Sequence, residues 1–233
     1  MKNKISVTHW CIAGACMATL LSFRAPATPA AAPAAQAPTL SVAPPPAGHY
    51  QLDKSHASLL LRVSHLGFST YTTRFSRFDA ELTFDPANLA ASQVVTTIDT
   101  ASLEMDGAPQ ACIDIVRGPQ LLDTAKFPQI TFRSDRVHVS SNSLEITGTL
   151  NLHGVTRPLV LTATFNGGFA GVPMDPHARV GFSAHGSFKR SDFGMGFGVP
   201  PPGTTFGVGD LIDVSIEAEF TGPPLNTPAA APH

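Results

Sequence analysis

The chain has 233 residues, of which 43% are hydrophobic and only 14% are charged, against about 25% charged residues in an average soluble domain. All 17 acidic residues fall in the central part of the chain together with 12 of the 15 Lys and Arg residues, so this part carries a net charge near −5. An acidic domain is a poor partner for nucleic acid. The sequence contains no run of 18 or more apolar residues, so it predicts no membrane-spanning helix.

The N-terminal segment is typical of a secretory signal peptide. Lys2 and Lys4 precede an apolar run that ends at Phe23, and small residues follow at 25–27. A charged start, a short apolar region and an Ala-x-Ala site are the features that signal peptidase recognises. We therefore expect a periplasmic or secreted protein.

Proline content divides the chain into four predicted parts. These are a cleaved signal peptide (1–27), an Ala/Pro-rich disordered linker (28–47), one folded domain (48–222) and a disordered tail (223–233). The alternative to an ordinary cleaved signal peptide is a lipid anchor at Cys16. The apolar run continues past this cysteine, which favours the ordinary signal peptide. After cleavage Cys112 would be the single thiol, and we expect it to be half-buried and inert.

Alternation of apolar and polar residues predicts β-strands throughout the folded domain. In chain order, the expected strands are 58–65, 73–84, 92–99, 129–134, 136–140, 143–153, 157–165, 178–190 and 210–220. A short helix is expected around 111–116. Eight or nine antiparallel strands, each with one apolar face, indicate an all-β barrel or sandwich. Strands of ten or more residues favour the barrel, because closure removes exposed edges.

The sequence lacks complete motifs for a serine hydrolase, a dinucleotide-binding loop and a histidine metal site. The segment 181–186 has His185 where a nucleophile elbow requires glycine. The glycine-rich segment 194–199 ends in Val199 and precedes three prolines instead of the helix that a dinucleotide loop requires. No two histidines have metal-binding spacing along a strand or helix. We therefore predict no catalytic residue, metal or cofactor.

The apolar strand faces supply the candidate ligand-binding residues. A barrel with a cavity would bind a hydrophobic ligand on these faces, whereas a barrel filled with side chains would bind none, and the pattern leaves both open. His65 continues one apolar face, Arg190 ends the strand at 178–190, and Asp192 follows two residues later. The candidates are Leu59, Leu61, Val63, His65, Phe78, Leu82, Phe84, Ile146, Phe182, Arg190 and Asp192.

Several blocks of the sequence together resemble the YceI-like family of bacterial, mostly periplasmic lipid-binding proteins. In family order, the blocks are 50–56, 63–69, 75–79, 82–86, 127–134, 147–158 and 190–195. The resemblance implies a single antiparallel eight-stranded, lipocalin-like β-barrel with short helical connections, whose channel holds a polyisoprenoid, an isoprenoid quinone or a similar amphiphile. It also implies a homodimer. Cys112-Ile113 aligns with a charged Arg-Asp-type pair of family members.

Our first hypothesis is a non-enzymatic binding protein that takes up a long-chain isoprenoid or other lipid for transport, storage or isoprenoid metabolism. Loading would involve transient contact with a membrane. One alternative is a lipid cyclase or isomerase in which His65 or Asp192 acts as acid or base inside the barrel. Another is an accessory protein that contacts a membrane redox complex without binding lipid.

Overall fold

The computed structural model describes residues 43–141 and 143–225. The predicted signal peptide, most of the predicted linker and residues 226–233 of the predicted tail lie outside these residues. The described part contains ten strands: β1 (Gly48–His65), β2 (Ser69–Phe75), β3 (Phe78–Phe84), β4 (Gln93–Asp99), β5 (Leu103–Glu104), β6 (Gln129–Val139), β7 (Leu144–Leu152), β8 (Val155–Phe169), β9 (His177–Lys189) and β10 (Val208–Pro224).

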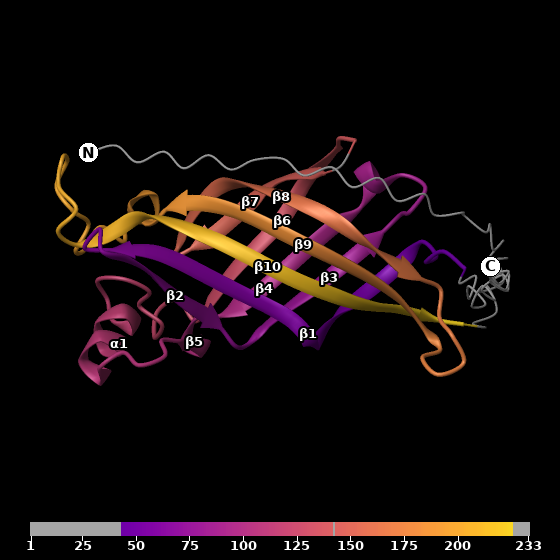
Figure 1. The fold of residues 1–233 in the computed structure, drawn as a ribbon, viewed down its shortest axis with the longest axis horizontal. Coiled ribbons are helices and arrows are strands. Elements are labelled where there is room, and N and C mark those ends of the chain that lie inside the picture. Colours follow the sequence, from indigo (N-terminus) through magenta and orange to yellow (C-terminus); the bar gives the residue numbers. More distant parts are fainter. Residues whose placement is uncertain (1–42, 142, 226–233) are drawn as a thin grey trace, which may run out of the picture. The chain divides into compact units, whose positions relative to one another are not determined.

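Eight of these strands form a closed antiparallel barrel (Figure 1). The order is β10-β9-β8-β7-β6-β4-β3-β1, and pairing of β1 with β10 closes the ring. At one end, β2 pairs with the second half of β1, and the short β5 pairs with β2. The all-β, eight-stranded antiparallel barrel predicted from the sequence is therefore confirmed. Closure leaves few unpaired edges, which explains how strands with apolar faces remain folded as one unit.

Several expected strands have different boundaries in the structure; the strand expected at 58–65, for example, begins ten residues earlier, at Gly48. The expected strand 73–84 is interrupted at Ser76-Arg77 and forms β2 and β3. The expected strands 129–134 and 136–140 are a single strand, β6, with a bulge between Ser134 and Arg136. A bulge inserts an unpaired residue and reverses which residues face inward, so the alternation of apolar and polar residues restarts with the opposite phase after it.

The connections contain only short helices. They are α1 (Gln110–Arg117), η1 (Leu89–Ala91), η2 (Thr100–Ser102) and η3 (Arg190–Phe193). The first of these is the helix expected near 111–116. No helix in the described ranges is long and apolar enough to cross a membrane.

Residues 43–47, which the sequence assigned to the linker, contact the barrel. Pro45 is buried, the Tyr50 hydroxyl donates a hydrogen bond to the Pro46 carbonyl at 2.7 Å, and the Ala170 N–H donates to the Ala43 carbonyl at 2.9 Å. These contacts fix the chain just before β1, so the folded region begins a few residues earlier than the sequence indicated.

Candidate ligand-binding cavity

An apolar cavity of about 690 Å³ lies inside the barrel. Its lining on β10 runs from Val208 to Phe220. At ~3.3 Å per residue and a strand tilt of ~40°, this corresponds to about 30 Å along the barrel axis. The volume falls in the range of about 300–1,000 Å³ found for small-molecule sites. The filled barrel considered from the sequence therefore does not describe this structure, and the long, narrow space suits an extended chain.

Aromatic side chains close one end of the cavity. The ring of Phe84 lies 5.6 Å from the rings of Tyr50 and Phe165, measured between centroids. The Phe182 ring is 5.2 Å from that of Phe165 and 6.2 Å from that of Phe220. Edge-to-face and tilted pairs at these distances pack favourably. Burial raises the pKa of Tyr50 to about 12, as expected for a phenol in an apolar cluster.

Polar side chains line the opposite end, near α1. His65, Tyr71, Asp106 and Cys112 all border the cavity there. The Tyr71 hydroxyl donates a hydrogen bond to the Asp106 carbonyl at 3.2 Å, which joins β2 to the segment before α1. The Cys112 thiol is exposed, whereas the sequence analysis expected a half-buried thiol. A ligand with one polar group would find its hydrogen-bonding partners at this end.

Arg190 organises the segment between β9 and β10. Its side chain is only 5% exposed and donates to four backbone carbonyls, those of Met195, Phe197, Val208 and Gly209, at 2.6–2.9 Å. Burial lowers the pKa of Arg190 below its usual value. Because four of the five N–H donors of a guanidinium are occupied, this residue is suited to holding the segment in place.

Nine of the eleven residues predicted from the sequence border the cavity, namely Leu59, Leu61, Val63, His65, Phe78, Leu82, Ile146, Phe182 and Arg190. Phe84 and Asp192 do not. Phe84 lies on the same face of β3 as Leu82, but it is 1% exposed and packed within the aromatic cluster that closes the barrel. Asp192 is exposed in η3. Of the two residues considered as acid or base, His65 borders the cavity and Asp192 does not.

The sequence analysis missed part of the cavity wall on β2. Ser69, Tyr71 and Thr73 face the cavity, together with Phe75. These odd-numbered positions face inward before the break at Ser76-Arg77, and even-numbered positions do so after it. The alternation of residues 69–75 was the signal that could have revealed them, but the expected strand began too late and kept one phase throughout.

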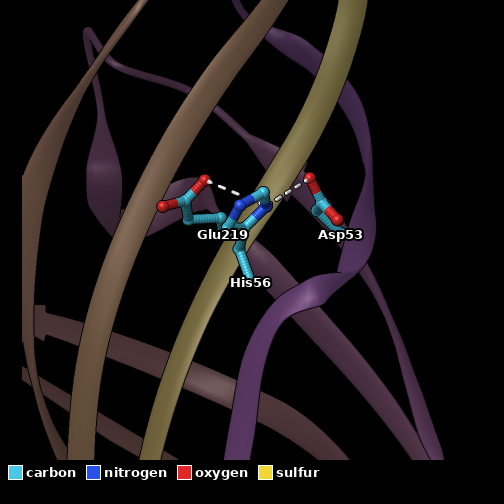
Figure 2. Close-up of side chains that lie close together, drawn as sticks. All are labelled: Asp53, His56 and Glu219. Atoms are coloured by element: carbon cyan, nitrogen blue, oxygen red, sulfur yellow. Dashed lines mark hydrogen bonds and ion pairs between the residues drawn. The ribbon is translucent and has the colours of Figure 1, made fainter.

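A polar cluster lies at the bulge in β1 (Figure 2). Leu52 pairs with Phe220 and Ala57 with Ala218, so residues 53–56 bulge out opposite Glu219. His56 Nδ1 lies 3.0 Å from Asp53 Oδ2 and 4.0 Å from Glu219 Oε2. The pKa of His56 is raised by its hydrogen bond to Asp53 and then by the charges of Asp53 and Glu219.

Asp53, His56 and Glu219 have the spacing of metal ligands, with ligand atoms within 4.8 Å of one another. Arg179, however, forms a hydrogen-bonded ion pair with the Asp53 carboxylate and a second with Asp175 at 2.7 Å. Hydrogen bonds from Ser55, His56 and Arg179 hold the pKa of Asp53 well below its usual range. A guanidinium on the same carboxylate repels a metal cation, so the arrangement fits an ion-pair network that fastens the bulge to β9.

Comparisons with known proteins agree with this architecture. A family model described as a YceI-like domain matches residues 50–220. A UPF0312 protein of Vibrio cholerae is 35% identical over 178 residues, which cover 74% of this chain and 87% of that protein. The crystal structure of BcnA from Burkholderia cenocepacia has a TM-score of 0.62 at 23% identity and covers 72% of this chain and 98% of that one.

A polyisoprenoid-binding domain from Saccharophagus degradans, implicated in plant cell wall breakdown, also has a similar structure. Its TM-score is 0.56 at 15% identity, and the match covers 75% of this chain and 98% of that domain. At 15% and 23% identity, the structures of this domain and of BcnA show that the chain shares their fold.

Proposed function

The chain belongs to the YceI-like family, and from this premise we propose that it is a non-enzymatic carrier that holds one long-chain isoprenoid lipid inside its barrel. The cavity carries this proposal, because it is apolar, closed by aromatic rings at one end and polar at the other. A chain that leaves water for such a site gains about 0.8 kcal/mol for each buried methylene group. The polyisoprenoid-binding domain of the same fold supports this ligand class.

The polar end would receive the head group of the lipid. His65 continues the inward face of β1 beyond Val63, at the point where the apolar lining ends. We expect His65→Ala to weaken binding of an isoprenoid with a polar head group and to leave binding of the matching bare hydrocarbon nearly unchanged. Equal losses for both ligands would contradict a head-group role for His65.

Native mass spectrometry of the purified protein tests the proposal directly. The expected result is a barrel with one bound lipid, which organic extraction identifies as an isoprenoid. The apoprotein should take up an added polyprenol or isoprenoid quinone and release it unmodified. A protein that binds no added lipid would refute the carrier, and conversion of the lipid to a product would favour the enzyme alternative. The same spectra report whether the protein is a homodimer.

The carrier would act in the periplasm or outside the cell. The proposal rests on the charged, apolar and small-residue segments of residues 1–27. N-terminal sequencing of the protein from its host should find a start between Thr28 and Ala37 in the periplasmic or secreted fraction. A chain that retains Met1, or one attached to the membrane through Cys16, would contradict this location.

A further inference from the structure

Two chain segments meet at the polar end of the cavity. They are the turn between β1 and β2 (residues 66–68) and the connection between β9 and β10 (residues 194–207), which lie at the same end of the barrel (Figure 1). The Leu66 N–H donates a hydrogen bond to the Gly207 carbonyl at 2.8 Å. Gly67 has a φ of +72°, and a Cβ atom there would lie 2.9 Å from the Cβ of Thr205. The two segments are therefore in direct contact.

These segments, together with Val208 at the start of β10, expose large apolar side chains to solvent. Phe68 is 87% exposed and Phe206 is 82% exposed, and Phe197 and Val208 are also exposed. Phe197 and Val208 border the cavity as well, so the surface is continuous with the cavity lining. We call these four residues the mouth patch. Contiguous exposed apolar side chains on a soluble domain commonly mark a surface that binds a partner.

The segments that carry the mouth patch contain no charged residue. None occurs in residues 66–73 or in residues 193–209, although the folded domain as a whole has a net charge near −5. The acidic residue that follows Val208 is Asp210, and its carboxylate accepts hydrogen bonds from the N–H and hydroxyl of Ser191. An uncharged apolar surface fits the uncharged interior of a lipid bilayer, where a charged side chain is costly.

Hydrogen bonds hold the backbone of the mouth patch in place at Phe197 and Val208. The four carbonyl groups that Arg190 binds belong to residues on both sides of the β9–β10 connection, including Phe197 and Val208. The Val208 N–H donates a further hydrogen bond to the Gly198 carbonyl at 2.9 Å. A surface that is already ordered loses less conformational entropy when it binds.

We propose that the mouth patch docks on a lipid bilayer, with Phe68 and Phe206 inserted at the interface. Phenylalanine is one of the side chains that membrane-surface proteins bury at the boundary between head groups and acyl chains. Docking would place the polar end of the cavity on the membrane, so that a lipid passes between bilayer and barrel without crossing water. The proposal rests on the proposed function for the identity of the cargo, but docking itself is measurable without cargo.

Flotation of the full-length protein with phosphatidylcholine vesicles tests the proposal. We expect the protein to float with neutral vesicles and Phe68→Ser/Phe206→Ser to reduce the partition coefficient at least about 30-fold, since two rings no longer leave water. Met174→Ser is the matched control. Met174 is 97% exposed but lies between β8 and β9, at the other end of the barrel, and its replacement should leave flotation unchanged. High salt should change binding less than about two-fold, because the patch carries no charge.

Three results would overturn the docking surface. In the first, the double variant floats as well as the wild-type protein. In the second, flotation requires anionic lipid and disappears at high salt. In the third, the wild-type protein is a dimer by analytical ultracentrifugation, does not float, and becomes monomeric in the double variant. The patch would then join two copies of the chain.

A separate measurement distinguishes docking from cargo binding. A polyprenol delivered from cyclodextrin should bind the double variant as tightly as it binds the wild-type protein, which also shows that the variant is folded. Transfer of the same polyprenol from vesicles should slow in the double variant. Flotation without binding of delivered lipid would refute the proposed function and leave the docking surface standing.

Discussion

Replacing Leu61 by tryptophan tests whether the cavity is the lipid site. Leu61 lies in β1, where it pairs with Val214 and Thr73, and its side chain is half-buried against the cavity. The larger indole can occupy cavity volume instead of displacing packed neighbours. We therefore expect the free energy of unfolding to change by less than about 0.5 kcal/mol, as for a surface substitution.

The same substitution should weaken ligand binding strongly. Tryptophan has about six more side-chain heavy atoms than leucine, and displacement of half that number of ligand carbons at ~0.8 kcal/mol each costs about 2.4 kcal/mol. This is roughly a fifty-fold loss of affinity. A hundred-fold excess of lipid over its Kd stabilises the wild-type protein by about 2.7 kcal/mol, or roughly 5–11 °C in Tm. Most of this shift should disappear in Leu61→Trp.

Thermal unfolding with and without lipid is the assay, and Val180→Trp is the matched control. Val180 is 1% exposed and does not border the cavity, so the indole must overpack the core and destabilise the protein by about 1–3 kcal/mol. Trp10 is the only tryptophan of the chain, so in a Trp10→Phe background the fluorescence of each indole reports on its own site. Equal destabilisation by both substitutions, with an unchanged lipid-induced shift in Leu61→Trp, would refute the cavity as the lipid site.

Three further predictions concern single side chains. The pKa of His56 is raised mainly by its hydrogen bond to Asp53. The stabilisation that protonated His56 gives the fold is therefore complete below the ordinary histidine pKa of about 6.5, and it disappears as the pH rises through the raised pKa. In urea unfolding, His56→Gln should therefore lower stability more at about pH 5.5 than at about pH 9, and an equal loss at both would contradict the pairing. Arg190→Gln leaves backbone carbonyls without their donors, so it should destabilise the protein by about 1–3 kcal/mol. It should also speed amide hydrogen exchange in residues 194–209. Unchanged exchange there would argue against a role of Arg190 in holding this segment. Cys112 is exposed and borders the cavity. In a chain that lacks the other two cysteines, its reaction with a bulky maleimide should therefore slow when lipid is bound. An unchanged reaction rate would place the lipid away from α1.

Local sequence pattern accounts for most of the strands. Alternation along residues 210–220 predicts a strand with one apolar face, and β10 presents Ile212, Val214 and Ile216 to the cavity as that pattern requires. This succeeds because successive side chains of a strand point to opposite faces, which is a property of the backbone alone. The short helix α1 was likewise detectable from its own residues.

The bulges could not be located from the pattern. On β1 the inward positions change from even at Leu52 to odd at Leu59, because residues 53–56 bulge opposite a single residue of β10. What stabilises this bulge is Arg179 on β9, which pairs with Asp53 across 126 positions of sequence. A contact between residues so far apart leaves no local signal.

The sequence by itself determined that the chain folds as an all-β domain and which side chains of most strands face inward. Only the tertiary structure decided that the interior is a cavity with one closed end and one polar end. Phe84 and Leu82 have the same place in the alternation, yet one packs into the aromatic cluster and the other borders the open space. Arg190 was a candidate ligand-binding residue, but its guanidinium donates hydrogen bonds to backbone carbonyls of the connection that follows it. The physical reason is that the volume inside a barrel depends on the number, tilt and stagger of all its strands together, whereas the alternation of each strand depends only on its own backbone.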